Sequence, residues 1–312
     1  MSESSRRTFP LVPRWRVAGI PFGEQRSLRR GPGSDVAGSR EYGPGDPVSK
    51  IDWYASARLS SARGGDVFVV REKYAEEAPR VVVLCDRRPA MALFPAEFPW
   101  LSKPAAVSAV ADAIVVSALA ARGEIGYLDY AGSERREGAP FWLPPRGRHR
   151  RWEVEERLAL LEFDAPEDNV ERALEQLTRL RGDLPSGSFV FIVSDFLSPP
   201  RLETWVHARS FRWDIVPVIV QDPVWEQSFP ELASVTVPFA EPGTGRVVAA
   251  RLSRSEARAR RVANEARLAR LLGELRSVGL DPLVVGTSDA LEIDREFLAW
   301  AELRRQGRRR AR

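Results

Sequence analysis

The sequence predicts an α/β protein whose parallel sheet is covered by helices, preceded by an irregular or β-rich N-terminal appendage. Three observations carry this prediction. From Arg80 onward, strand-like and helix-like segments alternate, which is typical of a parallel sheet with crossover helices. Two of the buried strand-like runs end in an aspartate. Residues 1–79 differ in kind, because proline, glycine and arginine dominate there and periodicity is weak.

We expect the strands at short apolar runs bounded by turn residues. They are Arg80–Cys85, Ile125–Tyr130, Phe189–Val193, Asp214–Val220 and Pro282–Val285, with a short extended piece at Pro140–Leu143. The alternation breaks at 231–252, where Val235–Val237 and Arg246–Leu252 flank the turn EPGTG. That arrangement predicts a β-hairpin insertion rather than another crossover unit.

Helices are expected between and after these strands. They cover residues 102–121, 149–161, 168–181, 202–210, 253–278 and 291–305. Asp168 and Glu171 have the spacing of a capping box, and Gly182 ends that helix. Ser253 opens the longest helix, in which a leucine-rich stripe lies opposite several arginines.

The composition bounds the function classes. With 312 residues and 44% hydrophobic content, the chain can bury a sizeable core. The single cysteine, Cys85, excludes an internal disulfide and a CxxC metal or redox site, and we interpret it as a core residue. His149 and His207 are the only histidines, which disfavours conventional hydrolase and metalloenzyme sites. The longest apolar run, 105–121, contains Asp112 and two serines, and the N-terminus has no signal core, so we expect a cytoplasmic protein without a membrane span.

Charge is distributed unevenly. Residues 1–80 carry 14 basic and 10 acidic side chains, and the last nine residues carry six arginines. The 27 basic and 33 acidic side chains between them give that part a net charge of −6. We interpret the tail at 306–312 as solvated, with binding to an acidic partner or RNA as the alternative.

One segment is more specific than the rest: SREYGPGDPVSKIDWYASARL, residues 39–59. GPGD predicts a turn in which Asp46 bonds backbone amides beyond it. IDWYASAR places Asp52, Trp53 and Arg58 within one or two helical turns, which suits a buried ion pair beneath an aromatic plane. The segment is interpreted as a plug that fixes the appendage to the sheet, as a partner-binding surface, or as both.

The segment resembles the signature of the bacterial domain-of-unknown-function family 58, whose members carry a von Willebrand factor A-like domain. The matching residues are Arg40, Tyr42, Pro44, Gly45, Asp46, Ile51, Asp52, Trp53, Ala57, Arg58 and Glu72, then Asp86, then Ser194, Asp195 and Phe196, with later matches in DPVWEQSFPE, PGTGR and LVVGTSDALEIDREFLAW. The resemblance implies a Rossmann-like von Willebrand A-type domain over residues 80–305.

In such domains the first strand ends in D-x-S-x-S, a later loop supplies a threonine, and another strand ends in aspartate, which together form a metal-ion-dependent adhesion site. The resemblance puts Asp86 and Asp195 at the two aspartates. It puts Arg88 and Ala90 at the serines and Asp168 at the threonine. Mg²⁺ prefers an octahedral shell of oxygens, which an arginine does not provide.

We therefore expect a degenerate site in which Arg88, or Arg87, is a tethered cation that pairs with Asp86 and Asp195. The alternative is an all-carboxylate Mg²⁺ site made of Asp86, Asp168 and Asp195. Asp168 has a simpler reading as well, as a helix N-cap alone.

The aromatic loop FPAEFPW follows the first strand, and its residues Phe94, Phe98 and Trp100 form a candidate interaction loop, with core filling as the equal alternative. The leading functional prediction is a non-enzymatic interaction or adaptor protein without a cofactor. The resemblance implies that it works with a MoxR-type AAA+ ATPase in assembly or maturation of a protein client. A metal-dependent enzyme using the carboxylates and a nucleic-acid binder using the tail are the alternatives.

Overall fold

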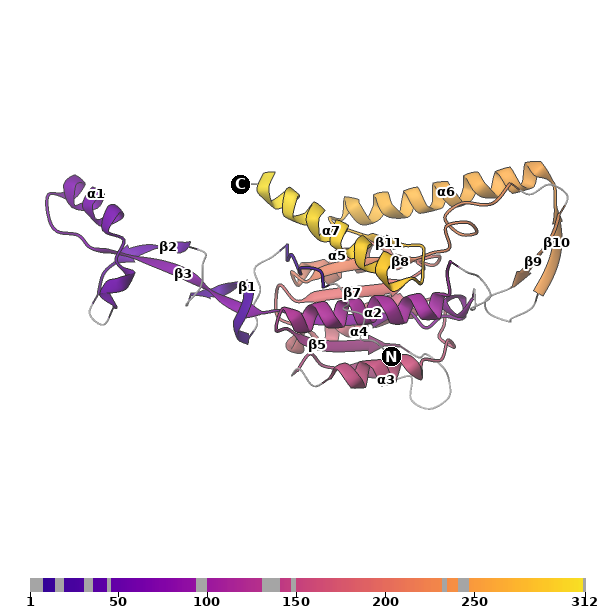
Figure 1. Cartoon of the computed structure of the whole chain (residues 1–312), viewed down its shortest axis with the longest axis horizontal. Helices are drawn as coiled ribbons and strands as arrows, with labels where there is room; N and C mark the ends of the chain where they lie inside the picture. The colour runs from indigo at the N-terminus through magenta and orange to yellow at the C-terminus, as the bar shows by residue number, and fades with distance from the viewer. Residues whose placement is uncertain are drawn as a thin grey trace.

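The structure is a computed structural model of the whole chain, and it describes residues 8–14, 20–30, 36–43, 46–93, 100–130, 141–146, 150–231, 235–240 and 247–310. Its body is a six-stranded sheet in the order β11-β8-β7-β4-β5-β6 (Figure 1). Neighbouring strands run parallel except β6, which pairs antiparallel with β5 at one edge. The predicted α/β architecture of a sheet flanked by helices is confirmed, and the edge strand β6 makes the sheet mostly rather than wholly parallel.

Each strand of the sheet lies within one residue of its predicted bounds. The strands are β4 (Arg80–Cys85), β5 (Glu124–Asp129), β6 (Phe141–Leu143), β7 (Phe189–Ser194), β8 (Asp214–Val220) and β11 (Leu283–Val285). The central strands form because both of their faces are covered, so a nearly continuous apolar run is stable there. In β4, Val81, Val83 and Cys85 belong to one hydrophobic core and Val82 and Leu84 to the other.

Helices cover both faces of the sheet. They are α2 (Lys103–Ala120), α3 (Arg151–Ala159), α4 (Asn169–Arg179), α5 (Leu202–Ser210), α6 (Arg254–Ser277) and α7 (Ala290–Arg310), with short 3₁₀ turns η2 (Pro89–Ala92) and η3 (Arg181–Asp183). Residues of α2, α3 and α7 pack in one core, and residues of α4, α5 and α6 pack in the other. Helix α7 continues into the predicted basic tail.

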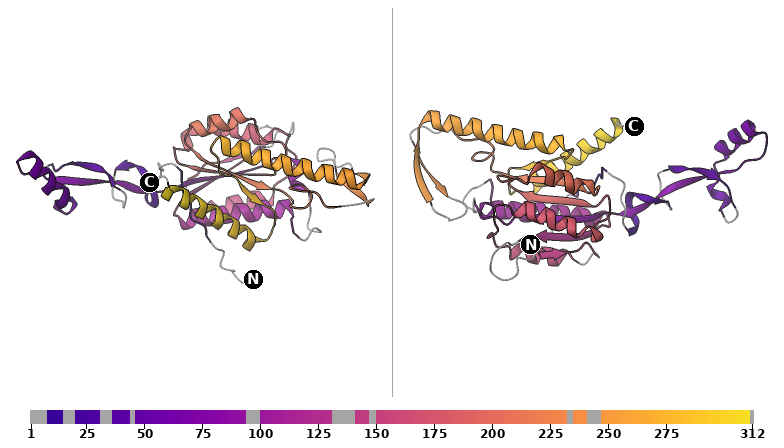
Figure 2. Two further views of the ribbon diagram at one scale, coloured as in Figure 1. Left: turned by 90° about the horizontal axis from the view of Figure 1, so that it is seen from above. Right: turned by 180° about the vertical axis from the view of Figure 1, so that it is seen from behind.

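The N-terminal appendage is a projecting arm. Strands β1 (Ile20–Arg30), β2 (Val36–Glu41) and β3 (Val69–Ala78) form an antiparallel sheet in the order β1-β3-β2. The 3₁₀ turn η1 (Val48–Lys50) and helix α1 (Trp53–Arg63) lie at its far end, away from the body in every view (Figures 1 and 2). Phe9, by contrast, packs in the body core against Phe297. The segment before the arm therefore contributes to the body.

The hairpin expected at 231–252 pairs as β9 (Val235–Ala240) with β10 (Val247–Leu252), antiparallel and in unbroken register. It leads into α6, whose N-cap Ser253 forms a full capping box with Glu256. The hairpin and the start of α6 extend from the body on the side opposite the arm (Figure 2). Among the described helices, α2 alone is long and apolar enough to cross a membrane by length and composition, and more than half of it is buried in the structure.

Candidate functional site at the carboxyl end of the sheet

Two aspartates lie where the central strands end, and Arg88 lies between them. Asp86 follows β4, Asp195 follows β7, and both are fully buried. The Arg88 Nη2 atom lies 2.7 Å from Asp86 Oδ2 and 2.5 Å from Asp195 Oδ1, and Nε donates to Asp86 Oδ2 at 2.9 Å. Arg88 is only 1% exposed, so this guanidinium faces the protein and not the solvent.

The bonds around Asp86 leave its carboxylate well satisfied. Oδ1 accepts from Asn169 Nδ2 at 2.7 Å and from the Arg88 backbone N–H at 2.9 Å. Oδ2 accepts from Ser194 Oγ at 2.6 Å. Asn169 is the first residue of α4, and Ser194 is the last of β7. Asp86 therefore joins β4, β7 and α4 at one buried point.

A second buried cation, Lys103, lies on the other side of Asp195. Its Nζ atom donates to Asp195 Oδ2 at 3.0 Å and to Glu226 Oε1 at 2.6 Å. Lys103 is the first residue of α2, and the helix brings its side chain against the strand ends. Glu226 in turn accepts from the Asp222 backbone N–H at 2.8 Å, just beyond β8. The site is thus an alternating row of charges: Asp86, Arg88, Asp195, Lys103 and Glu226.

The electrostatics of this row follow from burial and pairing. Burial opposes ionisation of Asp195, but Lys103 and Arg88 outweigh it and hold the pKa of that carboxyl below its usual range. Burial likewise lowers the pKa of Arg88, and the charges of Asp86 and Asp195 more than reverse that effect, so the pKa is raised. The pKa of Lys103 is raised for the same reason by Asp195 and Glu226. Burial dominates at Glu226 and raises its pKa.

The loop between α3 and α4, residues 160–168, lies against Arg87 and Arg88 and is held by both of them. We call it the covering loop. Arg87 Nε donates to the Glu162 carbonyl at 2.7 Å, and its Nη2 lies 3.1 Å from Asp164 Oδ1. Arg88 Nη1 lies 3.2 Å from Glu167 Oε2. The Glu167 side chain is 66% exposed, so it forms part of the surface above the buried cations. Arg87 also reaches Asp129 at the end of β5, at 3.3 Å.

Asp168 does not join the row. Its carboxylate accepts from Arg172 Nε at 2.7 Å, one turn into α4, and both side chains are about half exposed. The predicted capping box with Glu171 is wrong, because Asp168 makes no side-chain cap bond and Glu171 accepts from Arg201 and Thr204. Within the described residues, no group of three or more His, Cys, Asp or Glu side chains is arranged to hold a metal ion.

The signature segment lies on the arm, far from the strand ends. Arg40 makes a bidentate pair with Asp46, 2.6 Å for each bond. Asp46 also accepts from a backbone amide, but this is the N–H of Gly43, which precedes it, whereas the prediction was for amides beyond it. The Arg40 hydrogen bond holds the pKa of Asp46 down at about 2. Tyr42 donates its hydroxyl to the Asp46 carbonyl at 2.9 Å. Gly45 lies outside the described residues.

The predicted buried pair of Asp52 with Arg58 is wrong. Asp52 is the N-cap of α1, bonded by the Ala55 N–H, and its other oxygen accepts from Arg71 of β3 at 2.5 Å. Arg58 instead lies over the exposed ring of Tyr54, 5.8 Å from its centroid. The neighbouring Trp53 is 60% exposed, and its ring packs edge-on against Phe68 with 6.0 Å between the ring centroids. The segment also lies away from the body sheet, so it does not plug that sheet (Figure 1).

In the candidate interaction loop, Phe94 and Phe98 lie outside the described residues. Trp100 is half-buried and donates its indole N–H to Asp222 Oδ2 at 2.7 Å, beside the end of β8. Trp100 therefore packs beside the strand-end site. For this residue the structure agrees with core filling and not with an exposed interaction surface.

Sequence reasoning missed two members of the row, Lys103 and Glu226, and also Asn169, which donates to Asp86. Each lies far along the chain from Asp86 and Asp195, and no local spacing links them. One signal was available for Lys103, because it is one of three lysines in an arginine-rich chain and precedes an otherwise apolar helix. Asn169 follows Asp168, the residue that the resemblance selected. The resemblance therefore pointed to the correct helix start but to the wrong side chain, one residue too early.

Comparisons with known proteins place this chain in context. Uncharacterized proteins of Mycobacterium bovis and Mycobacterium tuberculosis are 35% identical to it over 66 residues, which is 21% of this chain and 21% of theirs. The match thus spans about a fifth of the length of those relatives. Two solved structures, titled a conserved hypothetical protein BatB from Bacteroides thetaiotaomicron and an aerotolerance-related membrane protein from Bacteroides fragilis, are 14% and 12% identical. Both comparisons cover 72% of this chain and 99% of the other, with TM-scores of 0.41 and 0.38.

The family comparison covers much more of the sequence. The profile described as "Protein of unknown function DUF58" matches residues 38–270, from the arm through most of α6. That range is more than half of the chain and includes both strand-end aspartates. The chain therefore belongs to the DUF58 family of proteins of unknown function.

Proposed function

We propose that this chain is a non-enzymatic protein-interaction module of the von Willebrand A type, in which internal cations replace the metal of the adhesion site. The observation that carries the proposal is the position of Arg88 between Asp86 and Asp195, with three contacts of 2.5–2.9 Å. A guanidinium among carboxylates neutralises them as a divalent ion would. Lys103 supplies a second positive charge to Asp195.

Mg²⁺ does not fit the residues present. The first-strand positions that supply hydroxyl ligands in such domains hold Arg88 and Ala90, and Asp168 turns away toward Arg172. Both aspartates already face a cation, which would repel an incoming metal ion. We therefore derive no step through a metal here, and the role of the row is to hold the strand ends and the covering loop.

Arg88 does not offer its charge directly to a partner. A side chain that is 1% exposed does not meet a partner's carboxylate without a rearrangement of the covering loop. The surface that a partner would read is the loop itself, where Glu167 is exposed and held from below by Arg88. Arg87 and Arg88 thus fix the shape of a docking surface.

The partner we propose, on the resemblance to the family, is a MoxR-type AAA+ ATPase, with assembly or maturation of a protein client as the joint task. Affinity capture with the purified chain as bait and a purified ATPase of this type as prey tests it directly. We expect Arg88→Ser to weaken capture by loosening the loop, and Glu167→Lys to weaken it by reversing a surface charge. Glu296→Lys on α7, an equally simple charge reversal on an exposed residue, serves as the matched control and leaves capture unchanged.

Two outcomes would contradict the proposal. Capture that is insensitive to both loop variants would place the ATPase elsewhere on the chain. Isothermal titration that shows millimolar or tighter binding of Mg²⁺ or Mn²⁺, abolished by Asp195→Ala, would show that the strand ends hold a metal after all.

A further inference from the structure

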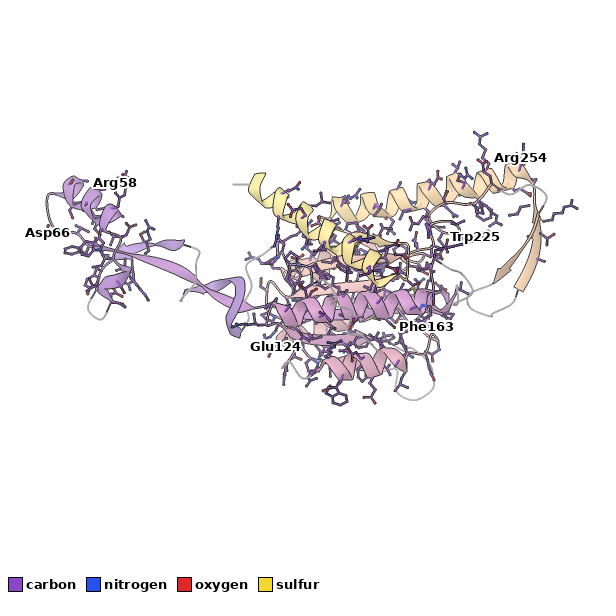
Figure 3. The ribbon with its side chains drawn as sticks, viewed as in Figure 1. Arg58, Asp66, Glu124, Phe163, Trp225 and Arg254 are labelled. Carbon is purple, nitrogen blue, oxygen red and sulfur yellow. The ribbon has the colours of Figure 1, made fainter. Side chains whose placement is uncertain are left out.

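A pocket lies at the amino-terminal edge of the body sheet, opposite the edge that holds the buried row. It has a volume of about 420 Å³, and small-molecule sites typically have about 300–1,000 Å³. Its walls come from residues 12–14, from the end of α6 and the approach to β11, and from residues 300–307 of α7. In Figure 3, Glu124 at the start of β5 marks this edge, and Phe163 in the covering loop marks the opposite edge. The pocket is therefore separate from the site described above.

Two of the arginines that line the pocket already have their charges matched. Arg304 donates to both oxygens of Asp214, the first residue of β8, at 2.9 Å each. Its Nε atom also donates to Asp281 Oδ2 at 2.9 Å. Arg14 donates through Nε to Asp281 Oδ2 at 2.8 Å, and its backbone N–H donates to Asp214 Oδ2 at 2.7 Å. Two arginines and two aspartates leave this network fixed in place and without net charge.

Arg276 is the third arginine of the lining, and it differs from the other two. It lies in the last turn of α6, and its side chain is exposed. Within the part of the chain that the structure describes, its guanidinium makes no hydrogen bond, ion pair or ring contact. Because the network of Arg14 and Arg304 is neutral, Arg276 gives the pocket one positive charge that no neighbour balances. A guanidinium of this kind binds a carboxylate through two parallel hydrogen bonds.

The rest of the pocket is mainly apolar. Its apolar side chains are Val12, Pro13, Pro282, Trp300 and Leu303. The ring of Trp300 is held in place, because Arg304 lies 4.2 Å from its centroid and its indole N–H donates to the Asp281 carbonyl at 3.3 Å. Leu303 is 69% exposed, so α7 presents an uncovered aliphatic side chain to the pocket. An apolar group that entered here would remove this surface from water.

We propose that the pocket binds a small organic carboxylate with an apolar body. The carboxylate pairs with Arg276, and the body packs on Leu303 and the other apolar side chains of the lining. One unmatched guanidinium balances one carboxylate, whereas a phosphate dianion would require a second unmatched cation, which the described lining does not contain. This ligand site goes beyond the proposed function, since it lies at the other edge of the sheet, and its test involves no ATPase.

Isothermal titration calorimetry on the full chain tests the charged contact. The probe is naphthaleneacetate, and its neutral amide, naphthaleneacetamide, is the matched ligand without charge. We expect the carboxylate to bind the wild-type chain about tenfold more tightly than the amide. Arg276→Ala should reduce the affinity for the carboxylate to that for the amide. Arg270→Ala removes another exposed arginine of α6 that does not line the pocket, and it should leave both affinities unchanged.

The apolar contact is tested on α7. Leu303→Ser should weaken binding of both probes by about threefold or more and leave the ratio of their affinities unchanged, because the two probes share the same body. Leu291→Ser is the matched control, since Leu291 is 51% exposed on the same helix and lies outside the pocket.

Three results would each overturn the proposal. They are wild-type affinity for the carboxylate weaker than about 1 mM, equal effects of Arg276→Ala and Arg270→Ala, and equal effects of Leu303→Ser and Leu291→Ser. Circular dichroism confirms that each variant is folded, and all four substituted side chains are exposed, so the fold does not depend on them.

Discussion

Replacement of Arg88 by methionine removes the central cation of the buried row while keeping a long side chain. Asp86 and Asp195, both fully buried, then lose their shared partner at 2.5–2.9 Å. Removing one member of a buried pair leaves an uncompensated charge, which typically costs about 3–5 kcal/mol. We expect the lower end, about 3 kcal/mol, because Lys103 still pairs with Asp195 and Asn169 still donates to Asp86.

A matched control is available on α4. Arg172 and Asp168 also lie 2.7 Å apart, but both side chains are about half exposed. An exposed pair of this spacing contributes little to stability, because solvent screens its charges. Arg172→Met removes a salt bridge of the same length as that of Arg88 but at an exposed position. Comparison of the two variants therefore measures the effect of burial. Urea unfolding followed by circular dichroism measures both free energies of unfolding, and a domain with about 5–15 kcal/mol of stability stays folded in either variant.

The pH dependence of the stability difference between Arg88→Met and wild type distinguishes a lost charge interaction from a lost packing contact. The pKa of Asp195 is lowered in the folded wild-type chain, so its stabilising contribution is present above the unfolded pKa of about 3.9 and is lost as the pH falls through the folded pKa. In Arg88→Met, protonation of Asp195 relieves a buried carboxylate that has lost one of its two cations. The deficit relative to wild type should thus be largest near neutral pH and shrink below about pH 4. A deficit no larger than that of Arg172→Met, or one that is constant with pH, would refute the reasoning.

Three further outcomes are expected. In Arg40→Ala, the pKa of Asp46 should rise from about 2 toward the ordinary aspartate value near 3.9, because the Arg40 hydrogen bond is its largest lowering cause; carboxyl ¹³C NMR titration measures this, and an unchanged value would contradict the bidentate pair. Gly126→Ala should lower the free energy of unfolding by about 1–3 kcal/mol, because a Cβ there would lie 2.7 Å from the Leu143 carbonyl oxygen. An unchanged free energy of unfolding in urea would mean that the edge strand shifts to accept the methyl group. Cys85 should react with a thiol reagent such as Ellman's only on unfolding, since burial raises its pKa; rapid labelling of the native chain would place it at the surface instead.

The strand-end site was only partly open to prediction from the sequence. Asp86 and Asp195 follow apolar runs that are typical of buried strands, and parallel strands bring their carboxyl ends to one edge of the sheet. That these two aspartates are neighbours at this edge was implied only by the family resemblance. Arg88 is close to Asp86 in the chain, which made it an obvious partner. Lys103 and Glu226 approach Asp195 from α2 and from the segment after β8, and that contact depends on how a helix packs across the sheet.

The errors have the same origin. Asp52 was paired with Arg58 because both lie on one short segment, whereas the actual partner, Arg71, comes from β3 across the arm. Asp168 was given a capping role from its spacing to Glu171, but Arg201 and Thr204 of a neighbouring element take Glu171 instead. In both cases a local pattern was outcompeted by a partner that only the folded chain brings within reach.

The sequence by itself determined the strands of the body sheet, most helix limits in the body and the two aspartates at the strand ends, because hydrophobic period and capping are local properties of the chain. Tertiary structure alone decided that Arg88 is enclosed, that Lys103 completes the row, and that α1 lies exposed at the end of an arm. Burial and charge pairing depend on residues more than 90 positions apart, such as Lys103 with Asp195 and Arg88 with Ser194. No spacing along the chain encodes those distances, since they are set by the packing of helices on the sheet.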